Sequence, residues 1–213
     1  MDYTFKNKAL FEEALSHSSY ANENNGKSYE RLEFLGDSIL SFIISEYLVD
    51  KYNLKEGELS KIRARIVCEN ALEMACTNAE LVPLIRLSRG EELTGGRERA
   101  SIIADVFEAV IAAVYLDGGI QPAKEFVFNN MTDIIPLAVS GKLNEDYKTA
   151  LQEIVQADGR TAEYRVISES GPEHNKIFTV ELCISGEKVS QGIGRNKKEA
   201  EQNAAKDYIL LKG

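Results

Sequence analysis

Hydrophobic residues recur at intervals of three and four between residues 8 and 137, a spacing that predicts helices burying one face each. The helices expected from this pattern cover residues 10–15, 29–52, 59–81, 100–116 and 122–137. Polar or glycine-containing stretches separate them, including 21–28, 56–58 and 87–99. Because residues 100–116 are apolar on nearly every side, we expect that helix to form the centre of an all-α domain.

The pattern changes after residue 146. A helix is expected over 147–156, followed by strands, marked by alternation and β-branched residues, and then by a second helix. The expected strands cover 162–168, 176–184 and 187–194, and the last helix covers 197–211. Ser185-Gly186 suits a tight hairpin turn between the second and third strands. The chain is therefore predicted to hold two domains: an all-α domain over 1–139, a linker over 140–146, and a small α-β-β-β-α domain over 147–213 with both helices on one face of the sheet.

Composition narrows the class of protein. The chain has 213 residues, of which 44% are hydrophobic, with no apolar run of about 18 residues and no basic, apolar leader. We therefore expect a cytoplasmic protein with no membrane partner. Cys68, Cys76 and Cys183 show no CxxC spacing and are expected to stay reduced, and the presence of two histidines argues against a Cys/His zinc site.

A net charge of −9 argues, taken alone, against a nucleic-acid partner. The distribution of charge along the chain weakens this argument. Residues 1–141 carry 14 Lys and Arg against 22 Asp and Glu, whereas residues 142–213 carry 11 against 12. The second part is therefore close to neutral, and it has a basic cluster of its own at Arg195, Lys197 and Lys198.

Two acidic pairs interrupt otherwise apolar helices. Glu33 and Asp37 are four residues apart, about 40° from each other on a helix, and Asp105 and Glu108 are three apart, about 60° from each other. Buried carboxylates without a partner cost several kcal/mol, so both pairs need a compensating cation. We expect all four carboxylates to converge on one site.

A hard divalent cation is the ligand that such oxygen donors prefer, Mg²⁺ first and Mn²⁺ as a substitute. The chemistry that a carboxylate-held cation serves most naturally is phosphodiester hydrolysis, and no organic cofactor is implied. The competing interpretation is a structural acidic cluster neutralised by Lys61, Arg63 or Arg65, which form a basic stripe on a neighbouring helix.

These motifs resemble the ribonuclease III family. The segment from Glu30 to Ser38, ERLEFLGDS, is similar to the family signature, and Asp105 to Ala109, DVFEA, is similar to its second acidic motif. The resemblance extends to residues 16–20, 57–60 and 95–98 and covers nearly the whole chain. The resemblance implies that Glu33, Asp37, Asp105 and Glu108 are metal-binding catalytic carboxylates and that Glu30 supports the cleavage centre. It also implies a homodimer that cuts both strands of double-stranded RNA, leaving 5′-phosphates, 3′-hydroxyls and short 3′ overhangs.

Phe34 and Gly36 lie inside the signature. Phe34 falls off the apolar stripe expected from Leu32, Leu35, Ile39, Phe42 and Ile43, and the resemblance implies that its ring inserts into a partner subunit. Gly36 in the middle of a helix costs about 0.5–1 kcal/mol relative to Ala, which suggests that another helix approaches closely there. Ordinary core packing is the alternative for both residues.

The second domain resembles a double-stranded RNA-binding domain, a module that recognises an A-form duplex by shape, 2′-hydroxyls and phosphates. Lysines at a helix amino terminus are locally unfavourable unless an anion such as phosphate sits there. The resemblance implies RNA contacts from three regions and, because this domain is less basic than such a domain is expected to be, further help from Arg97. The RNA-binding residues so implied are Thr149, Gln152, Glu153, His174, Lys197, Lys198 and Arg97.

The function expected from all these features is a Mg²⁺-dependent, double-strand-specific endoribonuclease, with ribosomal RNA precursors, messenger RNAs and other structured RNAs as family-implied substrates. The alternative is a non-catalytic RNA-binding homodimer that kept the fold. The presence of all four carboxylates favours the enzyme, since a binding protein does not need them.

Overall fold

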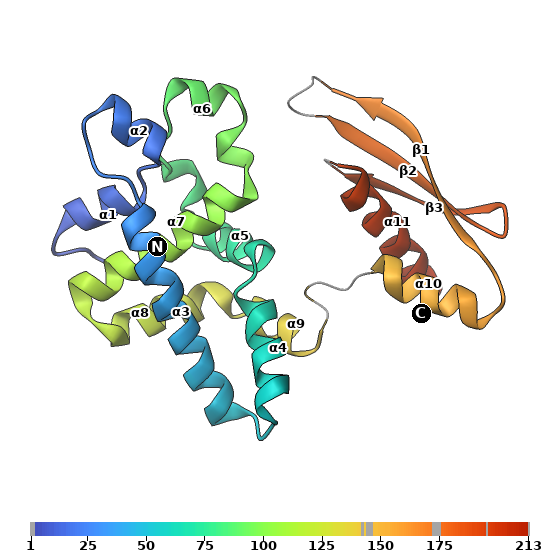
Figure 1. The fold of residues 1–213 in the computed structure, drawn as a ribbon, viewed down its shortest axis with the longest axis horizontal. Helices are drawn as coiled ribbons and strands as arrows, with labels where there is room; N and C mark the ends of the chain where they lie inside the picture. Colours follow the sequence, from blue (N-terminus) through green and yellow to red (C-terminus); the bar gives the residue numbers. More distant parts are fainter. Residues whose placement is uncertain (1–2, 142, 144–146, 172–175, 195, 213) are drawn as a thin grey trace. The chain divides into compact units, whose positions relative to one another are not determined.

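The computed structural model describes residues 3–141, 143, 147–171, 176–194 and 196–212. The chain divides into two compact units, Met1–Asn144 and Glu145–Gly213 (Figure 1). The first unit is helical and the second combines helices with a three-stranded sheet, so the predicted fold class is confirmed. The exact domain limits and the linker over 140–146 stay predictions.

The first unit is built around one long apolar helix, α7. α7 lies among the other helices of this unit (Figure 1). Eleven of its residues are buried and belong to the hydrophobic core. The described helices of this unit are α1 (Lys8–Ala14), α2 (Ser18–Glu23), α3 (Glu30–Lys51), α4 (Glu56–Ile66), α5 (Glu69–Asn78), α6 (Arg89–Leu93), α7 (Ala100–Gly118), α8 (Ile120–Met131) and α9 (Ile134–Val139), with short 3₁₀ turns η1 (Val82–Leu84) and η2 (Gly96–Glu98).

Several helix limits differ from the prediction. The single helix expected over 59–81 is wrong, because the chain extends at Cys68 and restarts as α5, which lets both α4 and α5 bury an apolar face. The break expected at 56–58 is the first turn of α4, where Glu58 accepts a hydrogen bond from the Lys55 amide at 3.3 Å. The helix expected over 122–137 is two helices, α8 and α9, and the loops expected over 21–28 and 87–99 contain the end of α2 and the short helices α6 and η2.

The buried stripe of α3 also differs in part. Phe42 was expected in the core but is 54% exposed, and Leu40 and Ile44 are buried instead. The reason is the direction from which α7 meets α3, which a helical repeat in the sequence does not define. Leu32, Ile39 and Ile43 are buried as predicted.

Gly36 marks the closest approach of α3 to α7. A Cβ built at this glycine would lie 1.9 Å from the backbone oxygen of Glu108. The predicted close approach of another helix is therefore confirmed. Because the neighbouring atoms are backbone, a side chain here would have to push the two helices apart.

The carboxyl end of α7 holds the start of the chain. The Asp117 carboxylate accepts hydrogen bonds from the Tyr3 hydroxyl at 2.7 Å and from the Lys6 and Asn7 amides at 2.8 Å. These bonds to Lys6, Asn7 and Tyr3 lower the pKa of Asp117, although partial desolvation acts in the opposite direction.

The second unit is an antiparallel sheet covered on one face by two helices (Figure 1). Its order is α10 (Tyr147–Ala157), β1 (Ala162–Ser170), β2 (Ile177–Ile184), β3 (Glu187–Gly194) and α11 (Lys197–Lys212). Ser185 and Gly186 both have positive φ, as a tight hairpin turn requires, so the predicted turn is confirmed. The core joins Leu151 of α10, Leu182 of β2 and Ala204 of α11.

Glycines let α11 lie directly on β3. A Cβ at Gly192 would come within 2.2 Å of the Ala200 oxygen and the Ala204 nitrogen, and one at Gly194 within 2.4 Å of the Ala200 nitrogen. The Ser190 hydroxyl adds a buried hydrogen bond to the Ala204 oxygen at 2.6 Å. The position of the α11 amino terminus is thereby fixed on the sheet.

In the described parts of the chain, no helix is both long and apolar enough to cross a membrane. The three cysteines remain thiols, as predicted, and Cys76 and Cys183 are buried.

We predict that Gly36→Ala destabilises the helical unit by about 1–3 kcal/mol, because the new methyl group overlaps the backbone of α7. Gly57→Ala is the matched control, since a Cβ on this helical glycine meets nothing within 4 Å and should be neutral or slightly stabilising. Urea unfolding followed by circular dichroism measures both variants. Equal midpoints for Gly36→Ala and the unsubstituted protein would contradict the packing argument.

Candidate functional site

Three carboxylates from two helices converge beside the Gly36 contact. Glu33 of α3 and Asp105 and Glu108 of α7 each present an oxygen, and these three oxygens lie within 4.8 Å of one another. All three side chains are half-buried. Asp37, one turn after Glu33, is exposed and lies outside this tight group.

The electrostatics of the group are unfavourable without a cation. Burial is the main cause that raises the pKa of Glu108 from its usual 4.5 to about 8, and the charges of Asp37, Glu33 and Asp105 raise it further. Burial and the neighbouring acids also raise the pKa of Glu33, and burial raises that of Asp105. The charge of Asp37 is among the causes that raise the pKa of Glu108, so Asp37 lies close enough to act on it electrostatically.

Lys61, Arg63 and Arg65 are the basic residues that could neutralise this cluster, and none of them forms an ion pair with it. Arg63 donates to the Ser45 hydroxyl at 2.9 Å, and Arg65 donates to the Ala138 carbonyl at 3.2 Å. Among the described residues, no Lys or Arg forms an ion pair with any of the four carboxylates. The arrangement therefore fits a hard divalent cation better than a structural acidic cluster.

Tyr29 contacts the cluster from the start of α3. Its hydroxyl donates a hydrogen bond to Asp105 Oδ2 at 3.2 Å, and burial together with the nearby carboxylates raises its pKa far above the usual value, so it stays a donor. The ring of His17 lies 5.8 Å from the Tyr29 ring, centroid to centroid. His17 Nδ1 accepts from the Ser19 amide at 3.2 Å and caps α2, which is a structural role.

Glu30 and Phe34 flank the cluster on α3. Glu30 is exposed, accepts a hydrogen bond from the Ser28 hydroxyl at 2.9 Å, and contributes to the raised pKa of Glu33. Phe34 is 79% exposed, so its ring has little to pack against within its own chain. The core-packing alternative for Phe34 is therefore excluded in this structure.

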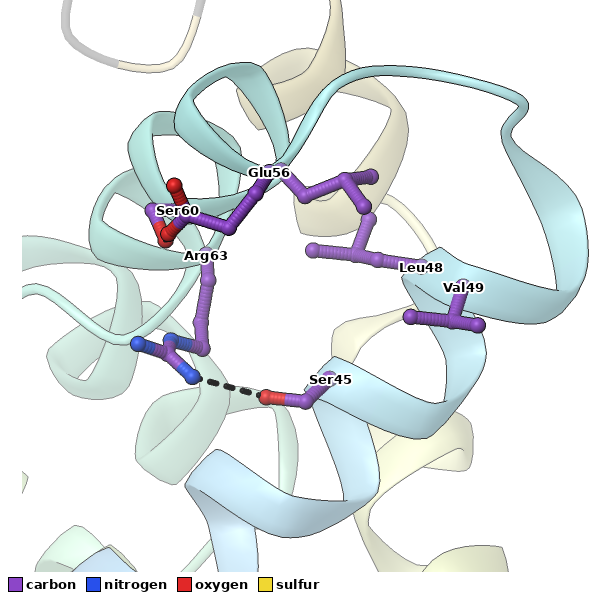
Figure 2. Close-up of a pocket in the computed structure, with 7 residues that line it drawn as sticks. Ser45, Leu48, Val49, Glu56, Ser60 and Arg63 are labelled. Atoms are coloured by element: carbon purple, nitrogen blue, oxygen red, sulfur yellow. Dashed lines mark hydrogen bonds between the residues drawn. The ribbon is translucent and has the colours of Figure 1, made fainter.

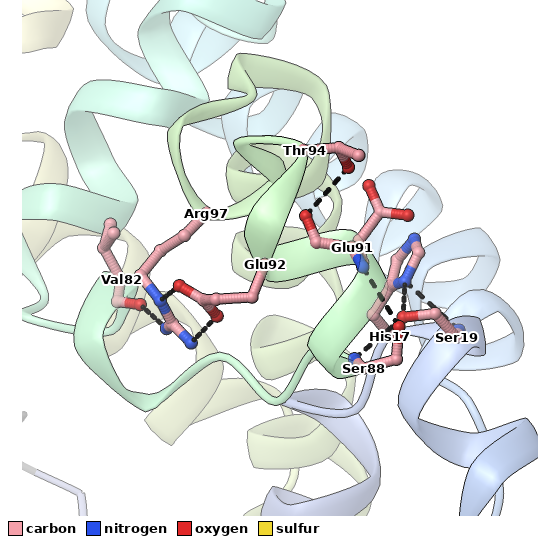
Figure 3. A network of polar contacts seen from close by, with 8 residues as sticks. All are labelled: His17, Ser19, Val82, Ser88, Glu91, Glu92, Thr94 and Arg97. Carbon is pink, nitrogen blue, oxygen red and sulfur yellow. Dashed lines mark hydrogen bonds and ion pairs between the residues drawn. The ribbon is translucent and has the colours of Figure 1, made fainter. Parts of the chain in front are cut away.

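Arg97 lies in a network of polar contacts that links α6 and η2 to η1 and, through Ser88 and Ser19, to α2 (Figure 3). Its guanidinium donates to both carboxylate oxygens of Glu92, at 2.8 and 2.7 Å, and to the Val82 carbonyl at 2.9 Å. The hydrogen bond lowers the pKa of Glu92. The RNA contact implied for Arg97 stays a prediction, and the contacts seen here hold a loop in place.

The RNA-binding residues implied for the second unit are described in part. Gln152 on α10 and Lys197 and Lys198 at the start of α11 are exposed. The two helices are tied together where the Lys148 amide donates to the Gln202 side chain at 3.2 Å. The side chains of Thr149 and Glu153 and the whole of Arg195 and His174 lie outside the described residues.

The sequence missed two features of the site. Tyr29 has no signal of its own, because its bond to Asp105 joins residues 76 positions apart. The pairing of Arg97 with Glu92 could have been found, since a basic and an acidic residue five apart in a short polar segment are natural partners.

Comparison with known proteins supports the class that the fold and acidic site define, a helical nuclease followed by an RNA-binding module. Residues 7–135 match the family described as Ribonuclease-III-like, and residues 147–211 match the double-stranded RNA binding motif. A Ribonuclease 3 of Clostridium perfringens is 51% identical over 98% of this chain and 90% of its own length. One of Caldanaerobacter subterraneus subsp. tengcongensis is 46% identical over 100% and 95%.

The solved nuclease domain of ribonuclease III from Campylobacter jejuni is also similar, with a TM-score of 0.59, 38% identity, and coverage of 63% of this chain and 92% of that one. The description of that structure concerns a region involved in dimer formation. The chain belongs to the ribonuclease III family, and it is a double-strand-specific endoribonuclease of the bacterial type, with a catalytic domain followed by a double-stranded RNA-binding domain.

We predict that the metal-free protein loses stability as pH rises from about 5 to 8. The folded protein holds the Glu108 proton up to a pKa of about 8, whereas the unfolded chain releases it near 4.5, so folding is favoured at low pH and this contribution disappears as pH rises. Thermal unfolding of the unsubstituted protein and of Glu108→Gln measures the effect. The difference between their melting temperatures should grow in favour of the variant toward pH 8, and a pH-independent difference would contradict this.

Proposed function

We propose that the enzyme cleaves double-stranded RNA as a Mg²⁺-dependent homodimer and that Glu33, Asp37, Asp105 and Glu108 hold the cation. The observation that carries this proposal is the convergence of three half-buried carboxylates from α3 and α7 without a basic partner in the described residues. Asp37 approaches from the exposed side and adds a fourth charge. Mn²⁺ is expected to substitute, because it prefers the same oxygen ligands.

The proposed role of each residue at this site follows from its position. Bound here, Mg²⁺ supplies a water of lowered pKa and neutralises charge on the phosphodiester. Glu33, Asp105 and Glu108 must lose their protons to bind it, and Gly36 keeps the helices that carry them in contact. Exposed Glu30 lies beside Glu33, where it supports the cleavage centre.

Glu108→Gln is expected to lower the cleavage rate by at least about 100-fold while leaving duplex affinity unchanged, because a cation ligand is lost and the second domain is intact. The assay is cleavage of a long RNA duplex with Mg²⁺, with EDTA as the metal-free arm. Glu125→Gln, a neutral substitution of an exposed acid on α8, is the control and should cleave normally.

Retained turnover of Glu108→Gln at saturating Mg²⁺ would contradict the metal assignment. If the unsubstituted protein bound the duplex but did not cleave it with Mg²⁺ or Mn²⁺, the RNA-binding homodimer without catalysis would be the correct function.

The outer face of α3 supports a homodimer. Phe34 and Val49 are 79% and 70% exposed and lie on the same side of the helix, about 22 Å apart along its axis. Phe42, between them, is 54% exposed. Exposed apolar residues gathered on one helix mark a protein interface more often than a free surface.

A pocket of about 380 Å³ lies at the far end of this face, between α3 and α4 (Figure 2). It is lined by Ser45, Leu48, Val49, Glu56, Leu59, Ser60 and Arg63. Arg63 is held at its wall by the hydrogen bond to Ser45 at 2.9 Å. If two copies of α3 pair antiparallel about a twofold axis, each Phe34 ring reaches the pocket of the partner subunit, and we propose this self-complementary arrangement.

Phe34→Asp should convert the dimer to a monomer at micromolar concentration, since the variant loses the ring that fills the pocket and must desolvate a carboxylate to enter it. Leu93→Asp is the matched control, because Leu93 is also apolar and 69% exposed but lies on α6. Light scattering coupled to gel filtration gives the masses. A monomeric unsubstituted protein, or a Phe34→Asp variant that stays dimeric, would refute the proposed interface.

The second unit supports recognition of the duplex backbone. Asn196 caps α11 by accepting the Glu199 amide at 2.9 Å, which leaves Lys197 and Lys198 exposed at a positively polarised helix end. Lys197 is 3.8 Å from Glu169 and lies over the Phe178 ring, so its side chain is oriented without being buried. We propose that both lysines contact phosphates and that Gln152 contacts a minor groove.

Replacing both Lys197 and Lys198 by Ala is expected to weaken duplex binding and to reduce the slope of log affinity against log salt by about one per lysine. Lys188→Ala is the control, because Lys188 pairs with Glu181 at 2.8 Å on the sheet face away from the helices. Fluorescence anisotropy at several salt concentrations gives both quantities. An unchanged salt slope in the double variant would rule out the phosphate contacts.

We propose products with 5′-phosphate and 3′-hydroxyl ends, as the family resemblance implies. Short 3′ overhangs are proposed because two centres in a symmetric dimer face opposite strands. Ribosomal RNA precursors and other structured RNAs are the proposed cytoplasmic substrates, and sequencing of RNA ends after cleavage of a precursor transcript tests this.

A further inference from the structure

Tyr29 is bonded to three parts of the helical unit at once. Its amide donates to the Ser16 carbonyl at 2.9 Å, and its carbonyl accepts the Glu33 amide at 2.9 Å. Its hydroxyl donates to Asp105 Oδ2 at 3.2 Å. The side chain is 3% exposed, so this hydroxyl is shielded from competing water. One residue thus connects the first turn of α3, which carries Glu33, to the carboxylate on α7.

We propose that Tyr29 is a positioning residue for the metal site: its hydroxyl orients the Asp105 carboxylate by occupying Oδ2 and leaves Oδ1 for the cation. This inference rests on the proposed metal-dependent function. Oδ1 of Asp105 has no hydrogen-bond partner in the described part of the chain, so both of its lone pairs are open to a cation. A residue that holds a ligand in this way pre-orders the site and strengthens metal binding without touching the metal.

The competing reading is that Tyr29 only packs in the core, where its ring contacts the main cluster and His17. Tyr29→Phe separates the two readings, because it keeps the ring and removes only the hydroxyl. Tyr3→Phe is a closely matched control: it also removes a tyrosine hydroxyl that donates to a carboxylate, at 2.7 Å, but that carboxylate is Asp117 at the other end of α7.

The experiment measures the affinity of the RNA-free full chain for Mn²⁺ by electron paramagnetic resonance of the free ion. Tyr29→Phe should weaken Mn²⁺ binding about tenfold, and Tyr3→Phe should leave it unchanged. In cleavage assays Tyr29→Phe should raise the Mg²⁺ concentration for half-maximal rate by a similar factor, with a rate at saturating Mg²⁺ close to that of the unsubstituted enzyme. The assays are run at a temperature at which circular dichroism shows Tyr29→Phe to be fully folded, because partial unfolding would itself raise the apparent midpoint.

A Tyr29→Phe affinity and Mg²⁺ midpoint within twofold of the unsubstituted protein would overturn the inference, as would an equal loss in Tyr3→Phe. Glu108→Gln, measured in parallel, distinguishes this from failure of the proposed function. If Glu108→Gln loses Mn²⁺ binding while Tyr29→Phe retains it, the positioning role alone is wrong. If Glu108→Gln also retains it, the metal site itself is wrong and the inference falls with it.

Discussion

The contact between α3 and α7 at Gly36 is the constraint on which the rest of the helical unit depends. The absence of a side chain lets the backbone of Glu108 approach within a distance that no Cβ could share. That approach places Glu33 beside Asp105 and Glu108 and also settles which side of α3 is buried. The grouping of the three carboxylates and the core packing are therefore consequences of one close helix contact.

The same contact has an electrostatic cost, because it brings acidic side chains together at a partly buried site. Burial raises the pKa of all three clustered carboxyls, and the mutual repulsion of the acids adds to it for Glu33 and Glu108. A protein selected for stability alone would place a lysine or an arginine there, but Arg63 and Arg65 bond elsewhere. With the proposed cation between carboxylate and phosphate, the overall acidity of the domain is no objection to RNA.

The RNA-binding unit also depends on glycines at a close helix contact, but with a different result. Gly192 and Gly194 bring α11 onto β3, just as Gly36 brings α3 onto α7. The helix contact in the first unit brings three carboxylates together, whereas the one in the second fixes the amino terminus of α11, with Lys197 and Lys198 exposed. Small residues at helix contacts decide, in both units, where the charged side chains are held.

The sequence by itself determined the fold class, the strands and their hairpin turn, the close approach at Gly36, and the four acidic positions, because periodicity, turn chemistry and buried charge are local properties of the chain. It did not determine the break between α4 and α5, which lets each helix bury its own apolar face, or the burial of Leu40 in place of Phe42, which depends on the direction from which α7 packs. The bond from Tyr29 to Asp105 and the separation of Asp37 from the three clustered carboxylates were likewise decided by tertiary structure. Distances between residues far apart in the chain are set by how the helices meet, and no spacing along the sequence encodes them.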